Sequence, residues 1–192
     1  MEQTEQAAAL QHRYSLGAII LHWLIAFAII ANWIIAQIAE DLPKAEEQAL
    51  MGTHVALGMT VLILTVLRII WRIMHKPPPP NPDHARWERV LAHVVHKLLY
   101  VLMLGLPLSG YFMVQTGTGG MAIDMFGLFD FPATEMAKNH DTHETLEGVH
   151  ELFANAMLGL FVLHVVGAWK HQLLDRDGTV LRMLPFGKRT SA

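Results

Sequence analysis

Four histidines lie within long apolar segments and are the residues best suited to redox chemistry: His22, His54, His150 and His164. Ionisable side chains are costly to bury in a membrane-crossing segment, so they are functional candidates there. His150 and His164 bracket the stretch VHELFANAMLGLFVLH, which is otherwise almost wholly apolar. At ~100° and ~1.5 Å per residue, a helix would present both imidazoles on one face, about 21 Å apart.

His54 and His22 are the expected partners of His150 and His164, respectively. His54 opens its apolar segment at the level expected for His150, and His22 lies near the opposite end of the first segment, level with His164. Neutral imidazoles that face each other across a bundle are the ligands of a b-type haem. The pattern therefore predicts two bis-histidine haem b sites at two depths, with Gly58 and Gly167 leaving room for a flat macrocycle.

Other uses of intramembrane histidines remain open at this point. A lone histidine on an apolar helix is often only hydrogen-bonded, and a haem-free transporter or proton channel would also use such residues. A proton relay usually includes Asp or Glu, and the apolar runs contain neither. A zinc or copper site would gather its ligands at one level. The chain has no cysteine, which excludes disulfides, Cys-ligated iron–sulfur clusters and covalent c-type haem.

The remaining histidines divide into two groups. Those in polar flanks and loops are expected to be ordinary solvated residues: His12, His75, His84, His140 and His143. His93, His96 and His171 fall at the end of the bundle that also holds both termini.

Four apolar runs must position the ligands, over residues 15–39, 55–73, 98–114 and 152–169. With its flanks, each reaches the ~20 residues that span a bilayer core. The fold class predicted is an all-α integral membrane four-helix bundle binding two b-type haems. The expected domains are an N-terminal tail (1–14), a transmembrane cytochrome domain (15–174) and a C-terminal tail (175–192), with both tails cytoplasmic.

The charges predict the orientation. Twelve of the 14 basic residues fall on the side of the termini and the central connection, which places that side in the cytoplasm. The opposite face carries eleven acidic residues and only Lys44 and Lys138, about −9 in all. Such a field repels anions and attracts basic partners. Nucleic acid is not expected as a partner.

Two connections have distinct compositions. KPPPPNPDH, residues 76–84, predicts a stiff spacer in place of helix. Residues 115–142 contain TGTGG and MFGLFDF and predict a loop at the outer interface, with a short surface helix over residues 133–139.

The segments ILHWL, GTHVALG, LAHVVHKLLYVLMLGLPLSG and HELFANAMLGLFVLHVVGAWKH, with the closing DGTVLRMLP, resemble the bacterial cytochrome b561 family. This family shares its four-helix core with the cytochrome b subunits of membrane hydrogenases. The resemblance covers residues 13–186. It implies His22 and His164 as ligands of an inner haem and His54 and His150 as ligands of an outer one, in agreement with the pairing by depth.

The resemblance also implies reaction with a quinone, such as ubiquinone, at the inner end. His96 and His171 are candidates to bind a quinone carbonyl and pass protons; interfacial histidines, or hydrogen bonds to haem propionates, are the alternative. Arg68 and Arg72 are candidate propionate partners, because Arg pairs well with carboxylates, or simply topology anchors.

The predicted function is electron transfer across the bilayer between quinone and a periplasmic partner. The resemblance also admits superoxide oxidation, with superoxide giving its electron to the outer haem, but the acidic outer face does not attract an anion. A basic soluble electron carrier suits that face at least as well. A further alternative is a haem-bearing anchor subunit of a dehydrogenase or hydrogenase.

Overall fold

A computed structural model describes residues 13–81 and 84–185. Its main elements are four long helices: α2 (Leu16–Ala39), α3 (Lys44–Met74), α4 (Arg86–Thr118) and α5 (His140–Trp169). All four are long and apolar enough to cross a membrane. The predicted number and order of membrane helices agree with the structure.

Three of the helices extend well beyond their apolar runs, because polar residues begin and end them. Glu46 and Glu47 occupy the first turn of α3, where carboxylates interact favourably with the helix dipole. At the start of α5 the Asn139 side chain accepts a hydrogen bond from the Thr142 backbone N–H, at 2.9 Å. This N-cap starts the helix ten residues before His150.

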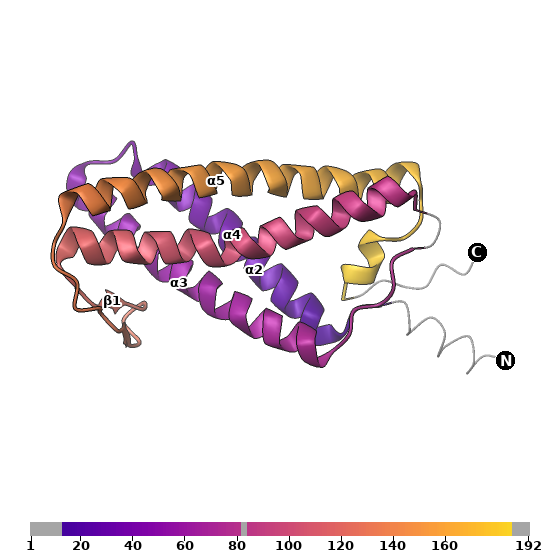
Figure 1. Ribbon diagram of the computed structural model, residues 1–192, viewed down its shortest axis with the longest axis horizontal. Coiled ribbons are helices and arrows are strands. Elements are labelled where there is room, and N and C mark those ends of the chain that lie inside the picture. Colours follow the sequence, from indigo (N-terminus) through magenta and orange to yellow (C-terminus); the bar gives the residue numbers. More distant parts are fainter. Residues whose placement is uncertain (1–12, 82–83, 186–192) are drawn as a thin grey trace.

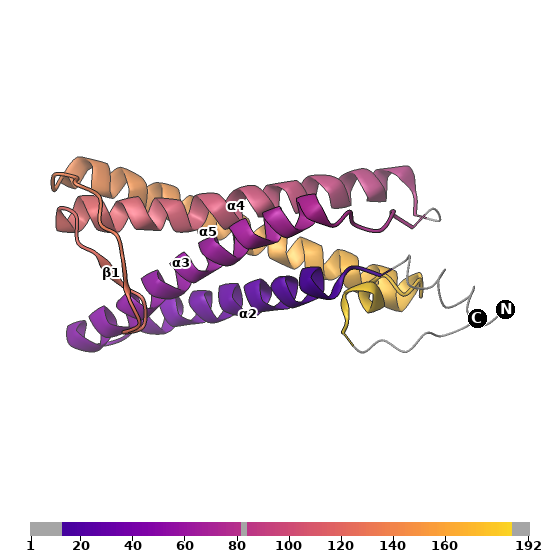
Figure 2. The same cartoon turned by 90° about the horizontal axis from the view of Figure 1, so that it is seen from below.

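The helices form two pairs along the long axis of the molecule, as Figures 1 and 2 show. α2 packs mainly on α3, α4 packs mainly on α5, and α3 also contacts α4. The four candidate ligand histidines are thus divided between the pairs, with His22 and His54 on α2 and α3, and His150 and His164 on α5.

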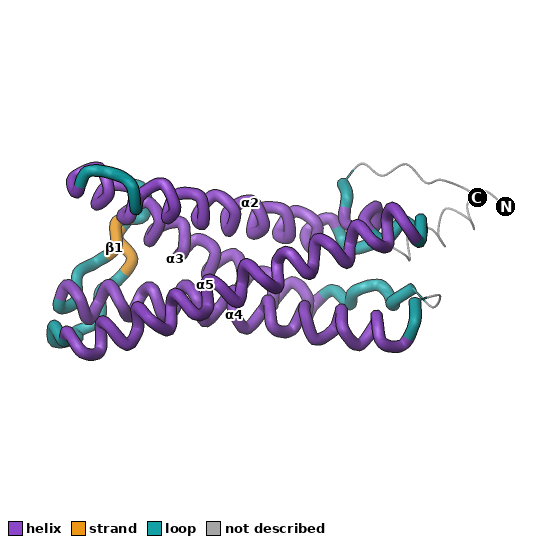
Figure 3. Tube along the Cα trace, turned by 90° about the horizontal axis from the view of Figure 1, so that it is seen from above, coloured by secondary structure: helices purple, strands orange, loops and turns teal. Residues whose placement is uncertain are grey.

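The connection between α4 and α5 contains a small β-hairpin at the end of the bundle away from the termini, the end called outer in the predicted orientation (Figure 3). Strands β1 (Ile123–Asp124) and β2 (Asp130–Phe131) pair antiparallel, and Ile123 and Met125 are buried with Ala56, Met59 and Tyr111. The hairpin therefore closes over α3 and α4 next to His54.

The short surface helix predicted over residues 133–139 is wrong, because that segment is irregular. Its backbone is held from the side by α4. The Gln115 carboxamide accepts the Thr134 N–H at 2.9 Å and donates to the Met121 carbonyl at 2.8 Å. The Tyr111 hydroxyl donates to the Pro132 carbonyl at 2.9 Å. These bonds hold the connection against α4 in an irregular conformation.

At the other end, α5 continues into the π-helical turn η1 (Lys170–Leu174), and the chain then forms the 3-10 turn η2 (Val180–Met183). Arg182 donates to the Pro79 carbonyl at 2.8 Å, and the Tyr14 N–H bonds the Arg182 carbonyl at 3.4 Å. Both described ends of the chain and the proline-rich connection therefore lie together, as four crossings require. Residues 76–81 are not helical, as the prolines predict.

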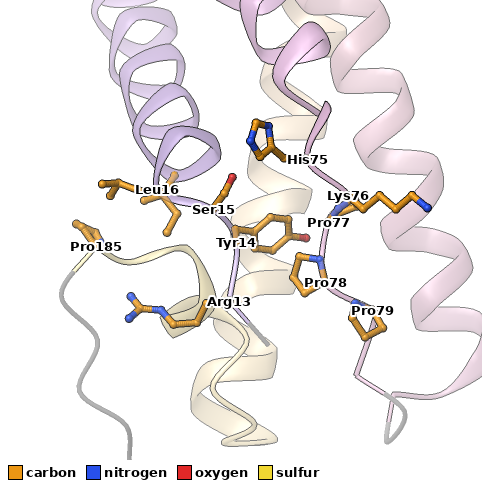
Figure 4. A pocket seen from close by; sticks show the side chains of 11 residues that line it. Arg13, Tyr14, Ser15, Leu16, His75, Lys76, Pro77, Pro78, Pro79 and Pro185 are labelled. Carbon is orange, nitrogen blue, oxygen red and sulfur yellow. The ribbon is translucent and has the colours of Figure 1, made fainter. Parts of the chain in front are cut away.

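These three segments surround a pocket, shown in Figure 4. Tyr14 and Ser15 line one side, and Pro77, Pro78 and Pro79 line another. No residue predicted to hold haem or quinone is among its lining residues.

Candidate functional site

The outer histidine pair spans the two helix pairs. The rings of His54 on α3 and His150 on α5 have centroids 6.1 Å apart and are inclined at 72°. Two imidazoles that bind one metal ion from opposite sides, each with its nitrogen ~2 Å from it, place their ring centres about 6 Å apart. The separation of the outer pair would allow both rings to bind one iron in this way.

Each outer ring is oriented through its second nitrogen. His54 Nδ1 lies 3.2 Å from the Asn32 carbonyl, and His150 Nδ1 lies 3.1 Å from both the Leu106 carbonyl and the Ser109 hydroxyl. Such bonds fix the tautomer in which Nδ1 carries the proton and Nε2 is free to bind a metal. Gly110 allows the close approach of α5, because a Cβ there would lie 3.0 Å from the His150 ring.

The inner pair has the same separation. The His22 and His164 ring centroids are 6.2 Å apart, at 78°. A third histidine touches this pair: the ring of His96 on α4 lies 5.1 Å from that of His164. This spacing is shorter than the ~6 Å of two imidazoles on opposite sides of one metal ion, and shorter than the 6.2 Å between His22 and His164.

Two further observations agree with a bound group beside these histidines. The Asn32 carboxamide oxygen is buried and has no hydrogen-bond partner among the described residues. Gly167 is half-buried, three residues beyond His164, yet a Cβ on it would meet no atom within 4 Å. A polar atom without a partner near the outer pair and an open position near the inner pair are what a site shaped for a bound group leaves.

The two candidate propionate arginines meet at one tyrosine of α4. Arg68 Nε donates to the Tyr100 hydroxyl at 3.0 Å, and Arg68 also donates to the Ala18 carbonyl at 2.8 Å, one turn from His22. The Arg72 guanidinium lies 5.7 Å from the centre of the Tyr100 ring. Both cations are therefore positioned on the inner side of the bundle.

His96 and His171 have different neighbours in the structure. His96 bonds the Ala92 carbonyl through Nδ1, at 2.5 Å, and contacts His164. His171 lies in η1, where its Nδ1 is 2.8 Å from the Asp175 carboxylate and its ring stacks on that of His84 at 3.9 Å.

His171 belongs to a cluster of ionisable side chains that was not predicted from the sequence. His84, expected to be solvated, is only 14% exposed and bonds the Asp177 carboxylate, while Lys170 bonds both Asp175 and Glu88. His143, also expected to be solvated, is part-buried and bonds the Met113 carbonyl at 2.9 Å. His12 lies outside the described residues.

Both aspartates of the cluster are held in their ionised form. The hydrogen bond from Lys170 lowers the pKa of Asp175 below its ordinary value. Burial would raise the pKa of Asp177, but hydrogen bonds from His84 and from the Thr179 N–H outweigh it and leave the pKa lowered. The inner end therefore carries fixed negative charge beside two imidazoles.

Comparison with known proteins adds a consistent set of relatives. The family model described as prokaryotic cytochrome b561 matches residues 13–186. The chain is 31% identical to the probable superoxide oxidase CybB of Yersinia pestis, over 90% of this chain and 96% of that protein. It is 31% identical to cytochrome b561 homolog 2 of Escherichia coli, over 93% and 94% of the two chains. It is also 30% identical to cytochrome b562 of Cereibacter sphaeroides, over 89% and 94%.

Proposed function

We propose a function for this chain from its family: it belongs to the prokaryotic cytochrome b561 family. Members of this family are bacterial multi-pass membrane proteins that bind haem b and transfer electrons. In the proposed function, the chain carries electrons between quinone at the cytoplasmic end and a partner at the outer end. The proposed location is the inner membrane, with both termini cytoplasmic. The charge distribution supports this orientation, because the end that holds the termini carries most of the basic residues.

One observation carries the proposal: two histidine pairs face each other across the helix pairs, at two levels and with nearly equal ring separations of 6.1 and 6.2 Å. In this proposal His54 and His150 hold an outer haem b, and His22 and His164 hold an inner one. Bound haem supplies one-electron redox chemistry, while the protein sets the ligands, their orientation and the dielectric.

The chain's own residues perform three tasks. The Asn32 and Leu106 carbonyls keep the proton on Nδ1 of the outer histidines, so that Nε2 remains the ligand atom. The hairpin and its buried residues Ile123 and Met125 exclude water beside His54. Arg68 and Arg72 are positioned to neutralise propionates at the inner level, which Arg does well with its planar fork of donors.

Quinone reduction also consumes protons, and His171 is the residue proposed to deliver them. Its Nδ1 lies 2.8 Å from Asp175, which orients the ring. Its Nε2 is then the atom available to a quinone carbonyl. His96 is next to His164, and its proposed role is to receive a propionate or quinone oxygen at the edge of the inner haem.

At the outer end, a basic soluble electron carrier is the proposed partner, because eleven carboxylates and two lysines face that side in the proposed orientation. Superoxide oxidation is the second candidate, since one relative bears that name. In that reaction two superoxide anions would each give one electron, releasing O₂, and one quinone would take two electrons and two protons. An anchor subunit of a dehydrogenase or hydrogenase is the third candidate.

The proposal is tested on the purified haem-loaded protein alone. Ubiquinol should reduce it, giving the α-band of a b-type cytochrome, and a basic cytochrome c should reoxidise it more slowly as ionic strength rises. Superoxide added under inert gas separates the second candidate, because a faster reduction by superoxide than by ubiquinol would favour it. No exchange with any of these would favour the anchor subunit.

A further inference from the structure

Two imidazoles and a carboxylate converge at the cytoplasmic end, away from both haem levels. His84 comes from the connection between α3 and α4, His171 from η1, and Asp177 from the segment before η2. One nitrogen of each histidine and one oxygen of Asp177 all lie within 4.8 Å of one another. Three segments far apart in the sequence therefore present their metal-ligating atoms to one point.

Only one carboxylate oxygen of Asp177 faces the two imidazoles. Its Oδ1 accepts the Thr179 backbone N–H at 2.8 Å, while its Oδ2 faces His84 Nε2 and lies 3.5 Å from His171 Nδ1. The two rings are stacked at 3.9 Å, so both nitrogens approach the same oxygen from neighbouring directions. The Asp177 and His171 side chains are only 11% and 14% exposed.

Carboxylates outnumber the ammonium in the contacts around this point. Glu88, Asp175 and Asp177 are joined through them with one ammonium, that of Lys170. Lys170 bonds Glu88 and Asp175, whereas Asp177 contacts the two imidazoles. A divalent cation would add positive charge beside Asp177.

A second group of ligating atoms, from Glu88, His171 and Asp175, lies next to the first. There the Lys170 ammonium already bonds both carboxylates, so a metal ion would have to displace it. No lysine bond to Asp177 is recorded among the described residues, and the group around Asp177 has two nitrogen ligands instead of one. The first group is therefore the better site.

The geometry points to a binding site for a divalent transition-metal cation formed by His84, His171 and Asp177. Two imidazoles and one carboxylate are a ligand set of zinc sites that keep a fourth position open to water. Mg²⁺ and Ca²⁺ prefer oxygen ligands only, and they should bind weakly. The site is independent of the proposed electron transfer.

Occupation of the site would join the α3–α4 connection to the end of α5. It would also take the Nδ1 of His171 away from Asp175. If His171 exchanges protons with quinone, accepting them from ubiquinol and returning them when quinone is reduced, a bound ion should slow the reaction with ubiquinol. This consequence, unlike the binding, rests on the proposed function.

The test is Zn²⁺ binding to the purified haem-loaded protein, measured by competition with a chromophoric chelator. The wild-type protein should bind one high-affinity Zn²⁺ per chain and no Mg²⁺ at equal concentration. His84→Ala and Asp177→Asn should each weaken Zn²⁺ binding at least ~10-fold, the smallest effect that supporting residues of metal sites show. His75→Ala, at the same end of the molecule, and Glu88→Gln should leave it unchanged.

Equal affinity in the wild type and in His84→Ala, or loss of binding in Glu88→Gln alone, would overturn the assignment. The reduced-minus-oxidised haem spectrum checks that each variant is folded. Zinc-edge X-ray absorption on the wild type needs no variant: it should show two imidazole ligands with a first shell near ~2.0 Å. A shell of oxygen alone would contradict the site. If Zn²⁺ binds as described but does not slow ubiquinol oxidation, the metal site is supported. The proposed role of His171 in proton transfer is then contradicted.

Discussion

The two histidine levels of this bundle have the same ring separation but different surroundings. At the outer level, His54 and His150 each bond a backbone carbonyl, and a hairpin packs on Ala56 and Met59 of α3. At the inner level, the ring neighbours of His22 and His164 are Trp23 and His96, and an ionisable cluster lies beyond. The difference agrees with the proposed function, in which the outer site passes electrons alone and the inner site couples them with protons.

The largest effect should distinguish ligands from neighbours at the inner level. His164→Ala should lose the inner haem completely, because a bis-histidine site cannot form with one ligand. His96→Ala should keep both haems, since the ring of His96 lies 5.1 Å from that of His164, closer than the 6.2 Å between His22 and His164. Haem content per protein measures both. Loss of a haem in His96→Ala, with none lost in His22→Ala, would replace His22 by His96 as the ligand.

The proton-coupled character of the inner end predicts the next effect. His171→Ala should slow reduction by ubiquinol about 100-fold, the lower end of what a positioned proton-transfer group contributes, while both haems remain. Stopped-flow absorbance at the α-band measures the rate. His140→Ala is the matched control, because this histidine is exposed at the outer end and pairs only with Glu144 among the described ion pairs. A haem lost in His171→Ala would instead make His171 a ligand.

Closure of the outer end can be weakened through Gln115, which is fully buried and holds both sides of the hairpin connection. Gln115→Leu should destabilise the protein by about 1–3 kcal/mol, because backbone groups lose their partners. Thermal loss of the outer haem signal reports it. Leu128→Ala, on a side chain that is 81% exposed in the same connection, should change stability by less than ~0.5 kcal/mol. Equal effects of the two substitutions would mean that Gln115 does not hold the hairpin closed.

The smallest effect concerns the tuning of the outer pair. Ser109 donates to the Leu106 carbonyl at 2.8 Å and accepts from His150 Nδ1, which makes the ring a stronger donor to iron. Ser109→Ala should raise the outer midpoint potential by less than ~60 mV, since the Leu106 carbonyl still holds Nδ1. Spectroelectrochemical titration measures the shift. An equal change at both levels would show that Ser109 does not act through His150.

The sequence was enough to predict the four helices and the proximity of His54 to His150 and of His22 to His164, whereas their role as haem ligands stays a prediction. Both predictions depend on local features of the sequence: apolar runs long enough to cross a membrane, and the fourteen-residue spacing of His150 and His164 on one helix. Local features of this kind do not depend on how distant segments pack. The first residues of the helices were not predicted, because hydropathy gives no indication of an N-cap. Asn139 caps α5, which begins ten residues before His150.

The features that depend on distant contacts were not predicted. His84 and Asp177 are 93 positions apart, and only the packing of η1 against the α3–α4 connection brings them together. The irregular segment over residues 133–139 depends on Gln115 of another element. His96 carries no sequence signal that distinguishes a neighbour of His164 from a quinone ligand at the membrane surface.

The central claim is that each histidine level holds one haem, and haem-to-protein stoichiometry tests it most directly. The wild type should contain two haem b per chain, His150→Ala one, His164→Ala one, and the double variant none. The two single variants should retain different spectra and potentials. A wild type with one haem, or single variants that each lose both haems while remaining folded, would contradict the two-level arrangement.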